Sequence, residues 1–191
     1  MFYLIAGLVI FLGLHSVRIF ANDRRSALIA QFGDKTWKLA YTAVSLIGFG
    51  LILWGFHLAR MEPQVLWPRI PGMNHAAGAL MLLAFILLVA AYVPGNFFKA
   101  RFGHPMVLSV KVWALAHLLA NNTLADLLLF GGFLLWAVVD FISLRRRDRA
   151  AAVQPRPGTM TGTLLTIIIG AVAFAVFAFW GHALLFGIQP I

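Results

Sequence analysis

The chain consists mainly of long apolar runs separated by short polar segments, and none of the runs shows the period-two alternation of a half-buried strand. A helix needs about 20 residues to cross the hydrocarbon core of a bilayer, and most of these runs are close to that length. The pattern therefore predicts an all-α, polytopic membrane protein with a single domain of six transmembrane helices. The predicted spans are Phe2–Phe20, Trp37–Leu58, His75–Val93, Met106–Ala120, Thr123–Phe141 and Gly162–Gly187.

The fourth predicted span is the shortest and the least apolar. Because Asn121 and Asn122 alone separate it from the fifth span, these two spans are expected to form a tight antiparallel helical hairpin. The first span starts without a basic segment before it and has no small-residue cleavage site after it. We therefore expect a retained anchor and not a removed signal peptide.

The composition agrees with a membrane protein and restricts its chemistry. With 62% hydrophobic and 11% charged residues among 191, the chain has more large apolar side chains than a soluble domain of this size can bury. Because it has no cysteine, disulfides, thiolate metal sites and thiolate haem ligation are excluded. Any chemistry must come from His, Asp, Lys, Arg or a cofactor.

The basic residues are divided unequally between the two sides of the predicted bundle. Arg60 and Arg69 lie on one side, Lys111 lies within the fourth span, and all others lie on the second side. By the positive-inside rule the second side is cytoplasmic, which predicts periplasmic N- and C-termini in a bacterial inner membrane. The net charge of +9 thus reflects orientation in the bilayer and does not indicate nucleic acid binding. The cytoplasmic group comprises Arg18, Arg24, Arg25, Lys35, Lys38, Lys99, Arg101, Arg145, Arg146, Arg147, Arg149 and Arg156.

Ionisable residues within the predicted spans are the candidates for function. A charged side chain at the bilayer centre costs about 2.5 kcal/mol or more, so such groups face the bundle interior or reach the membrane surface. His57 and His75 border the loop between the second and third spans and are expected to be solvated, whereas His182 fits packing and function equally. The remaining candidates are His15, Arg18, His104, Lys111, His117, Asp126 and Asp140.

His15 and Arg18 lie about one helical turn apart near the cytoplasmic end of the first span. In one interpretation both side chains extend towards the headgroups. In the other, His15 faces the bundle as a metal ligand or an acid/base group, because burial favours the neutral imidazole that binds metals.

The hairpin register places His117 level with Asp126, and His104 level with Asp140. We therefore expect Asp126 to accept the Nδ1–H of His117, which leaves Nε2 for a metal. Lys111 shares a helical face with His104. It is expected either to pair with Asp140 or Asp126 or to reach the headgroups.

Two motifs resemble the NnrU proteins of denitrifying bacteria and their relative, the ζ-carotene isomerase of plants and cyanobacteria. The first is His15-Ser16-Val17-Arg18, and the second is His104-Pro105-Met106 followed by Lys111-Val112-Trp113-Ala114-Leu115-Ala116-His117. Similarity to NnrU continues through Gly131-Gly132 and Trp136 to Arg147. The span count and the basic loops also agree with this family.

The resemblance implies haem b held between two membrane histidines, which the matching motifs assign to His15 and His117. His104 is an alternative ligand, because it is closer in depth to His15. Trp113 and neighbouring apolar residues would surround the cofactor, and Arg18 or Lys111 would pair with a propionate. A cysteine that can act as a ligand in the isomerase is Ala114 here, which removes that route.

The resemblance thus implies redox or ligand chemistry linked to nitrite and nitric oxide reduction, or isomerisation of a polyene-like hydrophobic small molecule. One alternative is a methyltransferase of the isoprenylcysteine type, which also carries an Arg-His-Pro motif. Here Gly103 replaces that arginine, and Arg101 is the nearest substitute. The other alternative is a carrier or assembly factor for a membrane oxidoreductase. Whether the protein is an enzyme stays open at this point.

Overall fold

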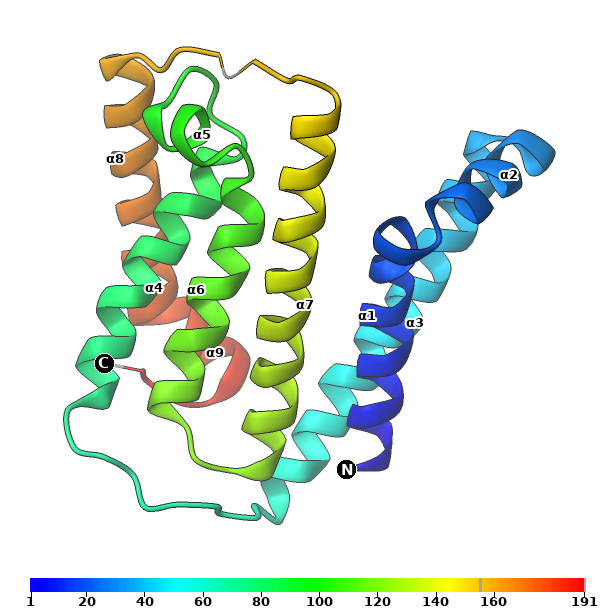
Figure 1. The fold of residues 1–191 in the computed structure, drawn as a ribbon. Coiled ribbons are helices and arrows are strands. Elements are labelled where there is room, and N and C mark those ends of the chain that lie inside the picture. Colours follow the sequence, from blue (N-terminus) through cyan, green and yellow to red (C-terminus); the bar gives the residue numbers. More distant parts are fainter. Residues whose placement is uncertain (155, 191) are drawn as a thin grey trace. The chain divides into compact units, whose positions relative to one another are not determined.

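The computed structural model describes residues 1–154 and 156–190, which form helices and short connections (Figure 1). Apart from an isolated backbone bridge between Val65 and Thr123, these residues contain no β-structure, which confirms the all-α prediction. The helices are α1 (Phe2–Phe20), α2 (Asn22–Phe32), α3 (Asp34–Met61), α4 (Met73–Ala90), α5 (Phe97–Phe102), α6 (Pro105–Ala120), α7 (Leu124–Ala150), α8 (Met160–Val176), the π-helix η1 (Phe177–Gly181) and α9 (His182–Phe186).

Five helices of the described chain are long and apolar enough to cross a membrane, which makes this a multi-pass membrane protein. The fourth predicted span corresponds to α6, whose 16 residues are about 24 Å long, less than the about 30 Å of a hydrocarbon core. The five long helices are Phe2–Phe20, Asp34–Met61, Met73–Ala90, Leu124–Ala150 and Met160–Phe186, the last of which combines α8, η1 and α9.

The chain forms two compact units. The first contains Met1–Pro68 and Asn122–Asp140, and the second contains Arg69–Asn121 and the residues from Phe141 onward. The helix α7 contributes its first part to one unit and its last part to the other.

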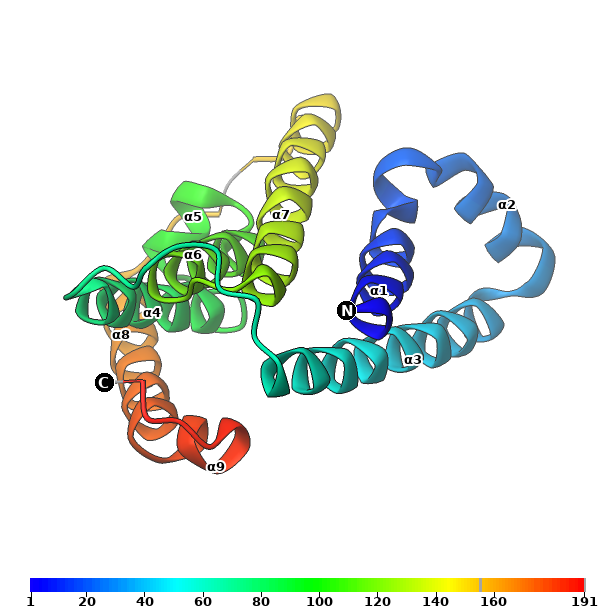
Figure 2. The same cartoon turned by 90° about the horizontal axis from the view of Figure 1, so that it is seen from below.

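In the first unit, α1 and α3 pack antiparallel at very short distance because glycines face the neighbouring backbone. A Cβ atom on Gly7 would lie 2.6 Å from the backbone nitrogen of Ile52, and one on Gly48 would lie 3.0 Å from that of Phe11. Leu4 is fully buried beside Gly55. Figure 2 shows α2, which the sequence did not predict as a helix, joining these two helices.

The first part of α7 packs beside α1 in the same unit. Phe11 contacts Phe133 with ring centroids 5.9 Å apart, and one turn further along both helices His15 contacts Trp136. Because residue numbers rise together along the two helices, α1 and α7 are parallel.

The segment after α3 is tied to the start of α7. Backbone bonds join Leu66 N–H to the Asn122 carbonyl and Leu124 N–H to the Gln64 carbonyl, both at 2.9 Å. The buried side chain of Asn122 also donates to the Trp67 carbonyl at 2.6 Å. These bonds satisfy polar groups at the turn where the sequence predicts a break between spans.

In the second unit, α4 packs against α6 and α8. A Cβ atom on Gly170 of α8 would lie 2.7 Å from the Ile86 Cα of α4, so these helices also approach closely through a glycine. Asn96, which is 1% exposed, caps α5 by accepting from Lys99 N–H at 2.7 Å and donates to two carbonyls at the end of α4. The loop between α4 and α6 is therefore firmly structured.

Replacing Gly7 with alanine should destabilise the α1–α3 pair, because the new methyl group meets backbone atoms that cannot move independently. We expect a loss of about 1–3 kcal/mol in unfolding free energy, measured by thermal or denaturant unfolding in detergent. Gly50→Ala on α3 is the matched control, since nothing lies within 4 Å of its Cβ position. Equal stability of the two variants would contradict this packing.

Candidate functional site

The predicted polar residues are divided between the two units. His15, Arg18, Asp126 and Asp140 belong to the first unit. The second unit contains His104, Lys111, Trp113 and His117.

His15 lies in an aromatic pocket to which three helices of the first unit contribute. Its ring stacks on Phe11 of α1 with centroids 4.2 Å apart and an interplanar angle of 28°. Tyr41 of α3 lies 5.3 Å away, and Trp136 of α7 meets the imidazole edge-on at 6.1 Å and 87°. The half-buried imidazole is thus surrounded mainly by aromatic rings.

The hydrogen bond of His15 determines its tautomer. Nδ1 lies 2.7 Å from the carbonyl oxygen of Phe11, and since a carbonyl oxygen can only accept, Nδ1–H is the donor. In the neutral ring Nε2 then carries the lone pair. Metal-binding histidines use this arrangement, with one ring nitrogen donating to a carbonyl and the other binding the metal.

His117, in the last turn of α6, has the same tautomer as His15. Its Nδ1 donates to the Trp113 carbonyl at 2.9 Å, and its ring lies 5.3 Å from that of Trp113. The expected bond from this nitrogen to Asp126 is therefore wrong. A backbone carbonyl four residues earlier in the helix takes the place of the carboxylate.

Asp126 caps the start of α7. Its buried carboxylate accepts from the Thr123 hydroxyl at 2.5 Å and from Thr123 N–H at 3.1 Å, while Asp126 N–H donates to the Thr123 hydroxyl at 3.3 Å. The first N–H groups of a helix lack partners within the helix, and a carboxylate three residues away satisfies them locally.

His104 immediately precedes α6 and forms a hydrogen bond with Asp148 near the end of α7. Nε2 lies 2.8 Å from the carboxylate, and about a quarter of each side chain is exposed. The sequence analysis placed His104 at the depth of Asp140, which is about two helical turns before its observed partner Asp148. The difference arises because α7 continues well beyond the predicted end at Phe141. Asp148 also lies 4.0 Å from Arg145, so it is paired with two basic groups.

Gly103, before the His-Pro pair, has a φ of +75°, a conformation that favours glycine. A Cβ atom there would lie 3.3 Å from an Arg145 guanidinium nitrogen. The backbone and its surroundings thus disfavour an arginine, or any other side chain, before His104-Pro105.

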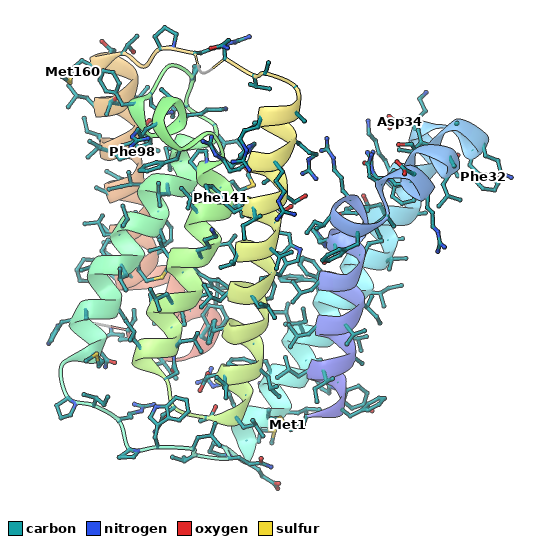
Figure 3. The ribbon with its side chains drawn as sticks, viewed as in Figure 1. Met1, Phe32, Asp34, Phe98, Phe141 and Met160 are labelled. Carbon is teal, nitrogen blue, oxygen red and sulfur yellow. The ribbon has the colours of Figure 1, made fainter. Side chains whose placement is uncertain are left out.

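Lys111 places its ammonium group over the ring of Phe141, 4.0 Å from the centroid, and Phe141 is labelled on α7 in Figure 3. His104 meets the same ring edge-on at 6.4 Å. Lys111 and His104 therefore share a face of α6, as predicted. Lys111 takes part in no ion pair found among the described residues, and the contact with Phe141 is a cation–π interaction.

The other histidines differ in exposure. His57 and His75 are exposed, as expected of solvated residues. His182 directly follows η1, and its Nδ1 donates to the Ile188 carbonyl at 2.7 Å. Its ring lies 5.0 Å from that of Phe186 and 6.0 Å from that of Phe177, so the observed contacts are packing and a backbone bond.

The sequence analysis did not identify Tyr41 and Trp136 as neighbours of His15, and it did not single out Ser45, which is on the same face of α3 as Tyr41. The indole nitrogen of Trp136 and the hydroxyl of Ser45 are buried and lack hydrogen-bond partners within the described structure. The spacing of Tyr41, Ser45 and Gly48, which puts them on one face of α3, was the available signal. In the described residues no group of three His, Cys, Asp or Glu side chains could hold a metal ion alone.

The helices and their apolar lengths define a polytopic α-helical membrane protein. Its sequence matches the family model described as NnrU protein over residues 3–190. The chain therefore belongs to the NnrU family, which confirms the resemblance found in its motifs. Searches of curated proteins and of solved structures found no match.

Removing the carboxylate of Asp148 should loosen the contact between the start of α6 and the end of α7. We expect Asp148→Asn to lower the unfolding free energy by about 1 kcal/mol, because a charge-assisted hydrogen bond becomes a neutral one in a partly exposed site. Thermal unfolding in detergent measures this loss, with the exposed Asp23→Asn of α2 as the control. A further loss of similar size on adding His104→Ala would show that the two residues do not interact.

Proposed function

We propose that this NnrU family protein binds haem b in the membrane, with His15 and His117 as axial ligands. The observation that carries the proposal is the shared hydrogen bond of these residues, in which Nδ1–H donates to the carbonyl of residue i−4. In their neutral form both imidazoles would therefore carry on Nε2 the lone pair that binds iron. Neither would need to change its tautomer to do so.

The geometry supports His117 over His104 as the second ligand. Nε2 of His104 is bonded to the carboxylate of Asp148 at 2.8 Å, whereas Nδ1 of His117 makes the backbone bond. Using Nε2 of His104 for iron would break this hydrogen bond to the end of α7. The backbone bond of His117 involves Nδ1, which would not be the iron-binding nitrogen.

The other proposed cofactor residues supply packing and charge. Phe11, Tyr41 and Trp136 would exclude water on the His15 side, and Trp113 would pack beside His117. Arg18 and Lys111 are the cations proposed for the haem propionates, since a carboxylate in the membrane needs a positive partner.

Bound haem would supply one-electron transfer or the binding of a small molecule such as nitric oxide. We propose a role in chemistry linked to nitrite and nitric oxide reduction or in isomerase-like chemistry on a polyene. The chain's own residues would fix the two imidazoles and keep water away. A thiolate ligand at residue 114 is excluded, because this position is a fully buried alanine.

His15→Ala and His117→Ala should each abolish six-coordinate haem, because one axial ligand is lost. Absorption spectra of the purified oxidised and reduced proteins, after haem supplementation, measure this as a loss or shift of the Soret band. His57→Ala and His75→Ala, at exposed positions, should keep the wild-type spectrum. A wild-type protein without a Soret band would refute the proposal, and a spectral loss in His104→Ala but not in His117→Ala would reassign the second ligand.

We also propose that α6 crosses the bacterial inner membrane, which gives six spans with both termini in the periplasm. The parallel packing of α1 and α7 supports this number. If α6 crosses, α7 is the fifth span and must run in the direction of α1. If α6 did not cross, α7 would be the fourth span and antiparallel to α1.

Single cysteines test this topology well, because the natural chain has none. Glu62→Cys should react with a membrane-impermeant maleimide applied to spheroplasts, since it follows α3 on the periplasmic side. Ala151→Cys, just after α7, should react only after the membrane is opened. Labelling of both positions from outside would favour five spans instead of six.

A further inference from the structure

Two polar atoms on helices that pack against α1 have no hydrogen-bond partner in the described structure. They are the indole Nε1 of Trp136 and the hydroxyl oxygen of Ser45, and both are buried. Buried polar groups in native proteins nearly always have a partner, so exceptions often mark an absent ligand or water. Within a bilayer, the hydrocarbon offers no hydrogen-bond partner.

One of these residues, Trp136, lies beside His15, which we propose as an iron ligand, and the other, Ser45, shares a face of α3 with Tyr41. The ring of Trp136 meets that of His15 edge-on at 6.1 Å. Ser45 is one turn after Tyr41, whose ring is 5.3 Å from that of His15, and about one turn before Gly48, which packs against the Phe11 backbone. The unsatisfied groups therefore come from α3 and α7, on the faces of these helices that turn towards α1.

We infer that the indole N–H of Trp136 donates a hydrogen bond to a propionate carboxylate of the haem bound at His15. The inference rests on the proposed function. An indole N–H can donate but cannot accept, so it needs an acceptor on the ligand. Because the four pyrrole nitrogens of haem b are bound to iron, the propionates are its remaining strong acceptors.

The arrangement of charge along α1 agrees with this orientation. Arg18 lies one turn beyond His15, towards the end of α1 that carries the basic residues of the following segment. A carboxylate held near this end would have a cation within reach on one helix and a neutral donor, Trp136, on another. Both reduce the cost of placing a carboxylate below the headgroups.

The variant Trp136→Phe removes the N–H group and keeps an aromatic ring. We expect the full-length variant, loaded with haem b in detergent, to transfer haem to excess apomyoglobin about tenfold or more faster than the wild type, because it lacks a hydrogen bond to a charged group. Trp54→Phe, at an exposed position on α3, is the matched control and should release haem at the wild-type rate.

Haem b dimethyl ester separates the hydrogen bond from simple packing. Its ester carbonyls carry no charge and accept hydrogen bonds more weakly than carboxylates, so Trp136→Phe should speed the release of the ester much less than the release of haem. If Trp136 only packs against the ring, the ratio of the two release rates is the same for haem and for its ester. That outcome, or release of haem at the wild-type rate by Trp136→Phe, overturns the inference.

Two further results keep the test decisive. If Trp136→Phe does not fold, benzothienylalanine at residue 136 keeps the bicyclic shape, lacks the N–H and should give the same faster release. If the wild type binds neither haem nor the ester, the proposed function fails and this inference fails with it. Normal haem binding by the wild type, with no effect of either replacement, overturns the inference alone.

Discussion

Polar groups inside a lipid bilayer must find their partners within the protein, and this constraint governs nearly every detail of the chain. Helix formation satisfies the hydrogen-bonding groups of the backbone. Polar side chains then donate hydrogen bonds to backbone carbonyls of their own helix. Ser16 donates to the Leu12 carbonyl and Thr166 to the Gly162 carbonyl, each at 2.7 Å and four residues back. His15 and His117 obey the same rule. In each of these histidines the hydrogen bond that satisfies Nδ1 also determines the tautomer of the neutral ring.

Close packing through glycine gives the first unit its geometry. Because Gly7, Gly48 and Gly55 carry no side chains, α1 and α3 approach until backbone atoms touch. This approach brings Tyr41 against His15, while Phe133 and Trp136 of α7 close another side of the same pocket. The pocket thus depends on residues that themselves have no chemical role.

Hydrophobicity alone predicted the long helices well, and α1 coincides with its predicted span. The sequence was a poorer guide where a polar segment is helical. The polar helix α2 was missed because it buries no residue, and the continuation of α7 through its arginine-rich end was missed because apolarity stops earlier. That continuation brings Asp148 to His104, a contact that no depth calculation from the predicted spans could find.

The candidate site was predicted in part. Motifs identified His15 and His117, and helix periodicity correctly placed Lys111 on the face of His104. The prediction that Asp126 accepts a hydrogen bond from His117, made from their equal depth, was wrong. The carboxylate of Asp126 instead accepts from Thr123 at the start of α7. Trp136 could not be recognised as a donor from the sequence, because an indole in an apolar span looks like ordinary packing.

The parallel contact between α1 and α7 also imposes an order on biogenesis. Phe11 and Phe133 are separated by more than a hundred residues, so the ribosome must synthesise most of the chain before they can meet. Until then the imidazole of the first helix lacks its indole neighbour and is open to lipid on that side. The aromatic surroundings of His15 are therefore completed late in translation. A molecule that needs contacts from both α1 and α7 can bind only after α7 has been synthesised.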